Sequence, residues 1–250
     1  MIPSLAFPSQ SPALALLASE PARAFVDLVA SRAPRAARAR GDGHRVIVYP
    51  GLGAGAWSTM RLRSTLAAAG FDCVDWGFGL NRGPRGSLPQ WLDRLAAAVE
   101  ADSAADGRKL SLVGWSLGGI YAREIARVVP HAVRQVVTLG SPFGAEAEAT
   151  HAGWLYRLLS GSEPPRSPRY LQDLRRPPPV PSTSVFSKAD GIVPWQGCLQ
   201  KEGPLSENIE APGVSHLGMG THRAVLALVA ERLAQPEGDW KPRSAAKSPD

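Results

Sequence analysis

Short unbroken apolar runs alternate with longer stretches in which apolar residues recur every three to four positions, from about residue 45 to residue 140. The short runs are typical of parallel strands that are buried on both faces, and the longer stretches are typical of helices. The predicted strands are 46–49, 71–76, 110–113 and 133–139, and the predicted helices are 57–69, 88–102 and 117–129. This order predicts the α/β class, with a mostly parallel central sheet flanked by helices.

The alternation breaks after residue 141. Residues 144–181 are rich in proline and hold one apolar stretch, so we expect an insertion there rather than a second domain. Strand patterns resume at 183–186 and around 208–210, and 221–234 has the pattern of a last helix.

The chain begins with a helix-like spacing over residues 12–32, interrupted by Pro21, and then a linker rich in alanine and arginine. A helix lying on a membrane surface is one reading of this segment, but packing on the domain is favoured. The predicted organisation is an N-terminal helix and linker (1–42), one α/β domain (43–235) with the insertion at about 144–181, and a polar tail (236–250).

Charge and cysteine content narrow the class of protein. The net charge is +6, but the arginines are scattered, and no basic stripe or nucleic-acid motif accompanies them, so we expect no nucleic-acid partner. The two cysteines form neither a disulfide framework nor a zinc pattern. No apolar run is long enough to span a bilayer, and the first residues make a poor signal peptide, so we expect a cytoplasmic protein.

A candidate nucleophile lies between the third predicted strand and the helix that follows it. Gly114-Trp115-Ser116-Leu117-Gly118 matches the pattern G-x-S-x-G in a strand–turn–helix setting. In that setting a tight turn exposes the serine at the N-terminus of a helix, where the partial positive charge favours a developing oxyanion. Ser116 is therefore the predicted nucleophile, and a structural serine in a glycine-rich turn is the alternative.

The serine needs a base, and His216 has the best position among the five histidines. It lies in a glycine-containing loop between the last predicted strand and the last helix, at the same edge of the sheet as Ser116. His222 is the rival, although it could simply cap that helix. His44 and His131 precede strands and should lie at the opposite edge.

An imidazole base requires a carboxylate that orients it and stabilises its protonated form. Asp190 follows the strand at 183–186 and is the predicted acid, with Asp75 as the fallback and an ordinary Asp-Gly turn as the alternative. No step of this chemistry requires a metal or an organic cofactor.

The order Ser116, Asp190, His216 and the surrounding motifs resemble the α/β-hydrolase superfamily, in particular its bacterial lipases and esterases. The resemblance covers about residues 45–235 and includes the turn Pro50-Gly51-Leu52-Gly53. It implies an oxyanion hole built from the backbone N–H groups of Leu52 and Leu117. Many lipases have His-Gly where this chain has Pro50-Gly51, so the chain departs from their pattern beside the first donor.

The resemblance also implies a cap formed by the insertion, which could line an acyl-binding cleft. The candidate substrate-binding residues are Trp115, Trp154, Leu155 and Leu158. We expect a serine esterase or lipase that cleaves carboxylic esters of small-molecule or lipid-like type. An acyltransferase or a cofactor-free haloperoxidase would use the same triad, and a catalytically silent binding relative is a further alternative. Acyl chain length and oligomeric state do not follow from the residues.

Overall fold

A six-stranded sheet forms the centre of the computed structural model, which describes residues 11–30, 39–144, 150 and 173–243. All neighbouring strands are parallel, and their spatial order is β2-β1-β3-β4-β5-β6. The strands are β1 (Arg45–Tyr49), β2 (Asp72–Asp75), β3 (Leu110–Trp115), β4 (Val133–Leu139), β5 (Ser182–Phe186) and β6 (Ser206–Glu210).

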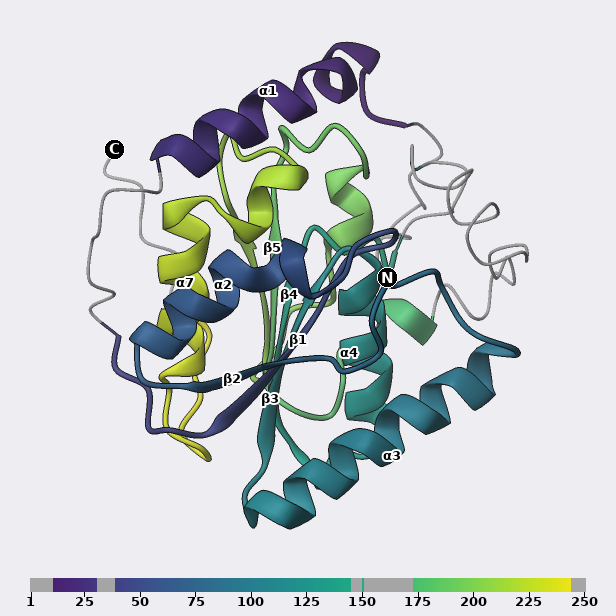
Figure 1. Ribbon diagram of the computed structural model, residues 1–250, viewed down its shortest axis with the longest axis vertical. Helices are drawn as coiled ribbons and strands as arrows, with labels where there is room; N and C mark the ends of the chain where they lie inside the picture. The colour runs from purple at the N-terminus through teal and green to yellow at the C-terminus, as the bar shows by residue number, and fades with distance from the viewer. Residues whose placement is uncertain (1–10, 31–38, 145–149, 151–172, 244–250) are drawn as a thin grey trace.

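Helices cover both faces of this sheet (Figure 1). Helices α3 and α4 pack together on one face, and α2 and α7 pack together on the other. The helices are α1 (Leu14–Ala30), α2 (Ala56–Ala68), α3 (Leu88–Asp106), α4 (Leu117–Val128) and α7 (Arg223–Leu233), with short 3₁₀ helices η2 (Trp195–Cys198) and η3 (Leu217–Gly220).

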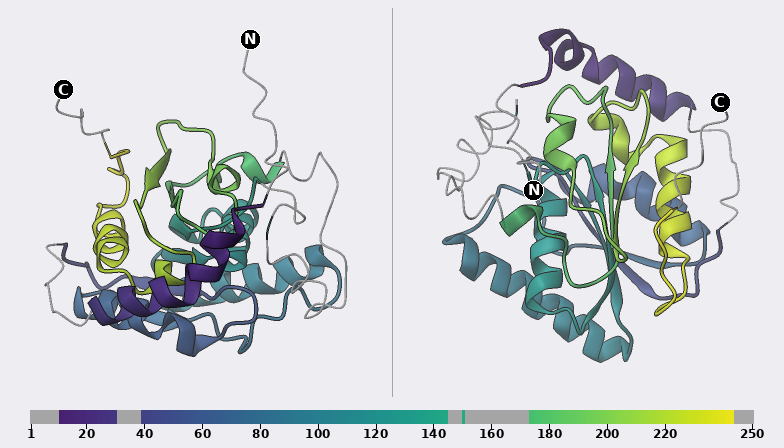
Figure 2. Two further views of the ribbon diagram at one scale, coloured as in Figure 1. Left: turned by 90° about the horizontal axis from the view of Figure 1, so that it is seen from above. Right: turned by 180° about the vertical axis from the view of Figure 1, so that it is seen from behind.

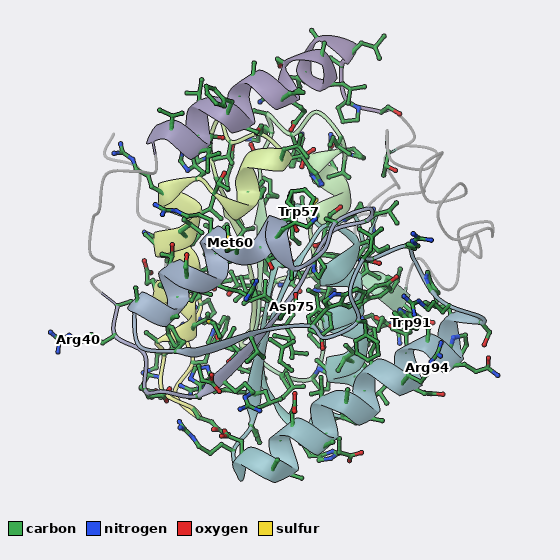
Figure 3. All side chains as sticks on the ribbon, viewed as in Figure 1. Arg40, Trp57, Met60, Asp75, Trp91 and Arg94 are labelled. Carbon is green, nitrogen blue, oxygen red and sulfur yellow. The ribbon has the colours of Figure 1, made fainter. Side chains whose placement is uncertain are left out.

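Alternation along β1 shows how one strand serves both cores. Val46 and Val48 belong to the apolar cluster under α2 and α7, whereas Ile47 and Tyr49 belong to the cluster under α3 and α4. Successive side chains of a strand point to opposite faces, so a continuous apolar run fills both layers. In Figure 3, Trp57 and Met60 are exposed on α2, whereas Trp91 of α3 is buried in the second cluster.

Helix α1 lies across one end of the molecule, beside η3 (Figures 1 and 2). Its outward side remains exposed, with Phe25 65% and Val26 63% accessible to solvent. The helix continues through Pro21. The structure therefore places the N-terminal helix against the domain, the arrangement that the sequence favoured.

The predicted α/β class and parallel sheet are confirmed. The ends of the predicted helices and strands differ from the observed ones by a few residues. The short 3₁₀ helices η2 and η3 were not predicted, because a single 3₁₀ turn is too short to give a periodic pattern. Most of the predicted insertion lies outside the described residues.

Candidate active site

Ser116 lies on a strained turn between β3 and α4. Its φ is 55° and its ψ is −121°, and it is the one non-glycine residue with positive φ in the described part of the chain. Such a backbone costs about 1–3 kcal/mol and persists only where its surroundings enforce it. A Cβ at Gly114 would collide with Gly118 and Gly119, and a Cβ at Gly118 would collide with the carbonyl oxygen of Tyr49. Close packing around the turn therefore holds Ser116 in place.

The two oxygens of the Asp190 carboxylate have separate partners. Oδ1 accepts hydrogen bonds from the backbone N–H groups of Ile192 and Val193, both at 2.8 Å. Oδ2 is 2.6 Å from Nδ1 of His216. The turn after β5 fixes the position of Asp190, whose own N–H donates to the carbonyl of Ser187. One oxygen is thus held by the backbone, and the other is directed at the imidazole.

His216 is buried and is the N-cap residue of η3. Burial alone lowers the pKa of this imidazole, but the charge and hydrogen bond of Asp190, together with the charge of Glu20, outweigh that effect and raise it above the ordinary value of 6.5. Trp115 Nε1 donates to the carbonyl oxygen of His216 at 3.2 Å. The residue before Ser116 is therefore bonded directly to His216.

The Asp190–His216 pair lies beside Ser116 at one edge of the sheet. Trp115, Leu139 and Val185 are in register across β3, β4 and β5. The N–H of Ser116 donates to the carbonyl of Leu139. A Cβ added at the next residue, Gly140, would lie 3.1 Å from His216 Nδ1 and 3.2 Å from Asp190 Oδ2. The structure thus pairs two of the predicted residues, Asp190 and His216, and places Ser116 on the turn whose N–H donates to the residue before Gly140.

The two predicted oxyanion donors lie on adjoining segments, Leu52 in the loop after β1 and Leu117 at the first position of α4. Leu52 and Leu117 are both half-buried, and Gly51 lies close enough to Ser116 that its added Cβ would be 3.4 Å from the serine Cβ. Asn81, which the sequence analysis missed, is fully buried and donates from Nδ2 to the carbonyl of Pro50 at 2.8 Å. No local motif marks Asn81, because its partner lies far away in the chain.

The rival residues have other partners. His222 caps α7, since its Nδ1 accepts from the N–H of Ala224, and its Nε2 lies 3.9 Å from Oδ1 of Asp27 on α1. Asp75, labelled in Figure 3, accepts from the N–H of Gly77 in the turn after β2. Neither residue takes part in the Asp190–His216 pair.

A second serine–histidine–aspartate cluster lies at the opposite edge of the sheet. His44 Nε2 is 2.7 Å from Ser111 Oγ, and its Nδ1 is 2.5 Å from Asp42 Oδ1. Ser111 lies inside β3, and both it and His44 are 0% exposed. A substrate has no access to that hydroxyl. This cluster connects β3 to the segment that precedes β1. Ser116, in contrast, is half-buried on a turn.

Trp115, predicted to bind substrate, has its ring in the core cluster under α2 and α7. The other candidates for substrate binding, Trp154, Leu155 and Leu158, lie outside the described residues. Within the described ranges, no group of three or more His, Cys, Asp or Glu side chains is arranged to hold a metal ion. None of the helices described has the length and apolar character needed to cross a membrane.

Comparison with known proteins gives one family match. The profile of the alpha/beta hydrolase family matches residues 46–244. A pimeloyl-[acyl-carrier protein] methyl ester esterase from a Shewanella species is 30% identical over 124 residues. That alignment covers 48% of this chain and 44% of the relative, so the match spans less than half of the relative's length.

Solved structures show the same fold at low identity. The Aspergillus fumigatus lipase B structure is 18% identical, with a TM-score of 0.62 over 77% of this chain and 52% of that one. The Bacillus licheniformis lipase BlEst2 structure is also 18% identical, with a TM-score of 0.58 over 81% of this chain and 94% of that one.

Proposed function

Because the chain belongs to the alpha/beta hydrolase family, we propose that it is a serine hydrolase that cleaves carboxylic esters. Ser116 is the nucleophile, His216 the general base and Asp190 the orienting acid. The observation that carries this proposal is the Asp190–His216 pair, held over Gly140 beside the strained turn of Ser116. The similarity to a methyl ester esterase supports an ester as the substrate.

The geometry supports acyl transfer in two steps. The Ser116 hydroxyl attacks the ester carbonyl while Nε2 of His216 accepts its proton, because Nδ1 is bonded to Asp190. The N–H groups of Leu52 and Leu117 stabilise the oxyanion of the tetrahedral intermediate. His216 then protonates the departing alcohol, which leaves an acyl-enzyme. A water deprotonated by His216 attacks that ester, and the acid is released as Ser116 regains its proton.

A series of p-nitrophenyl esters of increasing acyl length, together with a methyl ester of a dicarboxylic acid, would test this assignment. Wild type should release p-nitrophenol or acid, and Ser116→Ala should lose at least about 10⁴-fold in kcat, because removal of a triad nucleophile leaves only residual catalysis.

The matched control is Ser111→Ala, which removes the serine of the buried second cluster. We expect it to retain wild-type kcat. If Ser116→Ala stays active and Ser111→Ala does not, the assignment is wrong. A folded wild type that hydrolyses no ester would instead favour a silent binding protein.

A further inference from the structure

Glu20 is the buried side chain of an otherwise exposed helix. Among the α1 side chains that the structure describes, it alone is buried, at 1% exposure. A carboxylate is among the side chains least often buried without partners. Apolar residues of α1 such as Phe25 and Val26 face outward instead. Leu16 and Leu17 are only half-buried, so burial of apolar surface alone does not explain why α1 packs where it does.

The partners of Glu20 are the two loops that carry the candidate acid and base. Oε1 accepts from the N–H of Gly191 at 2.8 Å and from the N–H of His216 at 2.9 Å. Oε2 accepts from the N–H of Leu217 at 2.9 Å. One carboxylate thus holds the residue after Asp190, His216 itself and the residue after His216.

Arg23, one turn along α1, extends the same set of contacts. Its Nη2 donates to Glu20 Oε1 at 3.1 Å, and its Nη1 donates to the carbonyl of Ala189 at 2.7 Å. A Cβ at Gly191 would lie 2.5 Å from the carbonyl carbon of Leu16, so the acid loop lies directly against the α1 backbone. Helix α1 therefore joins the acid loop and the base loop, which follow different strands.

We propose that Glu20 is a positioning residue of the active site, which sets the geometry of His216 by holding the loops of Asp190 and His216 together. This inference rests on the proposed function for its catalytic consequence. Its structural consequence is independent of that function, because the imidazole titrates whether or not a substrate is known.

The charge of Glu20 acts in the same direction as that of Asp190: both favour the protonated imidazole. Arg23 places a cation 3.1 Å from the same carboxylate, so its removal leaves the negative charge of Glu20 less compensated. Replacing Glu20 should therefore lower the pKa of His216, and we expect replacement of Arg23 to raise it. The charged or titratable groups around this site are Asp190 on the acid loop, Glu20, Arg23 and Asp27 on α1, His222 before α7, and Cys198 of η2.

The experiment compares Glu20→Gln with Glu207→Gln. Glu207 is also buried, at 5% exposure; it accepts from Thr183 Oγ1 and from the N–H of Arg243, and it forms an ion pair with Arg232. It lies near the start of β6, whereas the site lies beyond the carboxyl ends of the strands. Both variants exchange a buried, hydrogen-bonded carboxylate for an amide. The control therefore makes the same chemical change at a position away from the site.

NMR titration of the labelled histidines, assigned with a His216→Ala spectrum, gives the first measurement. Glu20→Gln should shift the His216 titration to lower pH, and Glu207→Gln should leave it unchanged. In ester hydrolysis, Glu20→Gln should lose about 10-fold in kcat with KM within about twofold, because a base displaced by less than an ångström still costs catalysis. The acid limb of its kcat/KM profile should shift to lower pH with the imidazole.

Arg23→Gln is the second variant, because it leaves the three backbone bonds to Glu20 in place and remains informative if Glu20→Gln does not fold. Its His216 titration should shift to higher pH. The inference is overturned if either folded variant has the wild-type titration and the wild-type kcat. If wild type hydrolyses no ester but the titrations shift as stated, the proposed function fails and the positioning role of Glu20 stands.

Discussion

At the scale of single residues, the Asp190 carboxylate determines the tautomer of His216. Its Oδ1 is occupied by two backbone N–H groups, and its Oδ2 faces Nδ1 of the imidazole. The neutral ring therefore carries its hydrogen on Nδ1 and leaves Nε2 as the acceptor, which is the state that a general base requires.

This pair sets the expected pH dependence of the proposed esterase. The base acts only when it is neutral, so kcat/KM should rise with pH through the pKa of His216. Because that pKa is raised, the midpoint of the acid limb should lie above 6.5, as a rate profile of wild type would show. In Asp190→Asn the negative charge is lost, burial then dominates, and the midpoint should fall below that value.

Asp190→Asn should also lower kcat by about 10³- to 10⁴-fold, because an amide cannot stabilise the imidazolium and favours the wrong tautomer. Asp75→Asn, the fallback residue on the turn after β2, serves as the control and should retain wild-type kcat. Equal losses in the two variants would contradict the role of Asp190.

At the scale of elements, the close approach of α4 to β1 builds the serine turn. The N-terminus of α4 comes so near to β1 that Gly118 leaves no room for a side chain against the carbonyls of Tyr49 and Pro50. The same approach brings the loop of Leu52 beside Ser116. One steric requirement therefore serves both the proposed nucleophile and the predicted oxyanion donors.

Gly118→Ala should move α4 away from β1 and disturb both loops. We expect a loss of about 2–3 kcal/mol in the free energy of unfolding, which is typical of overpacking, and at least about 10-fold in kcat. Urea unfolding and the ester assay measure these two effects. Gly220→Ala is the control for stability, since its added Cβ would meet nothing closer than 3.7 Å, and a similar loss there would refute the steric explanation.

At the scale of the whole molecule, the buried Arg123 joins α4 to the segment that precedes β5. Its guanidinium donates to the carbonyls of Leu174 and Arg176 and to Oε1 of Gln200, and it lies 3.8 Å from the ring centroid of Phe143. Apart from Phe143, these partners lie more than fifty residues away from Arg123 along the chain. Arg123 thus anchors the chain where it returns to the sheet from the predicted insertion.

Arg123→Met keeps most of the aliphatic volume but removes three hydrogen bonds of a buried guanidinium, although Arg127 still donates to the two carbonyls and Ser182 to Gln200. Each lost bond costs about 1 kcal/mol, so we expect a loss of about 3 kcal/mol in the free energy of unfolding, measured in urea. Arg45→Met, which breaks the exposed ion pair with Asp72, should cost less than about 1 kcal/mol. Similar losses in both variants would contradict the anchoring role.

Positions that depend on short-range pattern could be predicted from the sequence. The strand, the glycine spacing and the helix around Ser116 are contiguous, and the positions of Asp190 and His216 follow from the rule that parallel strands end at one edge. Glu20, Asn81 and Arg123 could not be predicted, because each is defined by partners that are distant in the chain. A glutamate in a helix normally indicates a solvated face.

The hydrophobic pattern of the sequence predicts the α/β class and the order of strands and helices along the chain, because alternating hydrophobic periods are local properties of the backbone. The spatial order of the strands, and the pairing of Asp190 with His216 rather than with His222, come from tertiary contacts. The burial of the histidine near Ser111 and the contacts of α1 with the acid and base loops have the same origin. Those features arise when segments far apart in sequence are brought into contact, and burial and hydrogen bonding then decide what each residue can do.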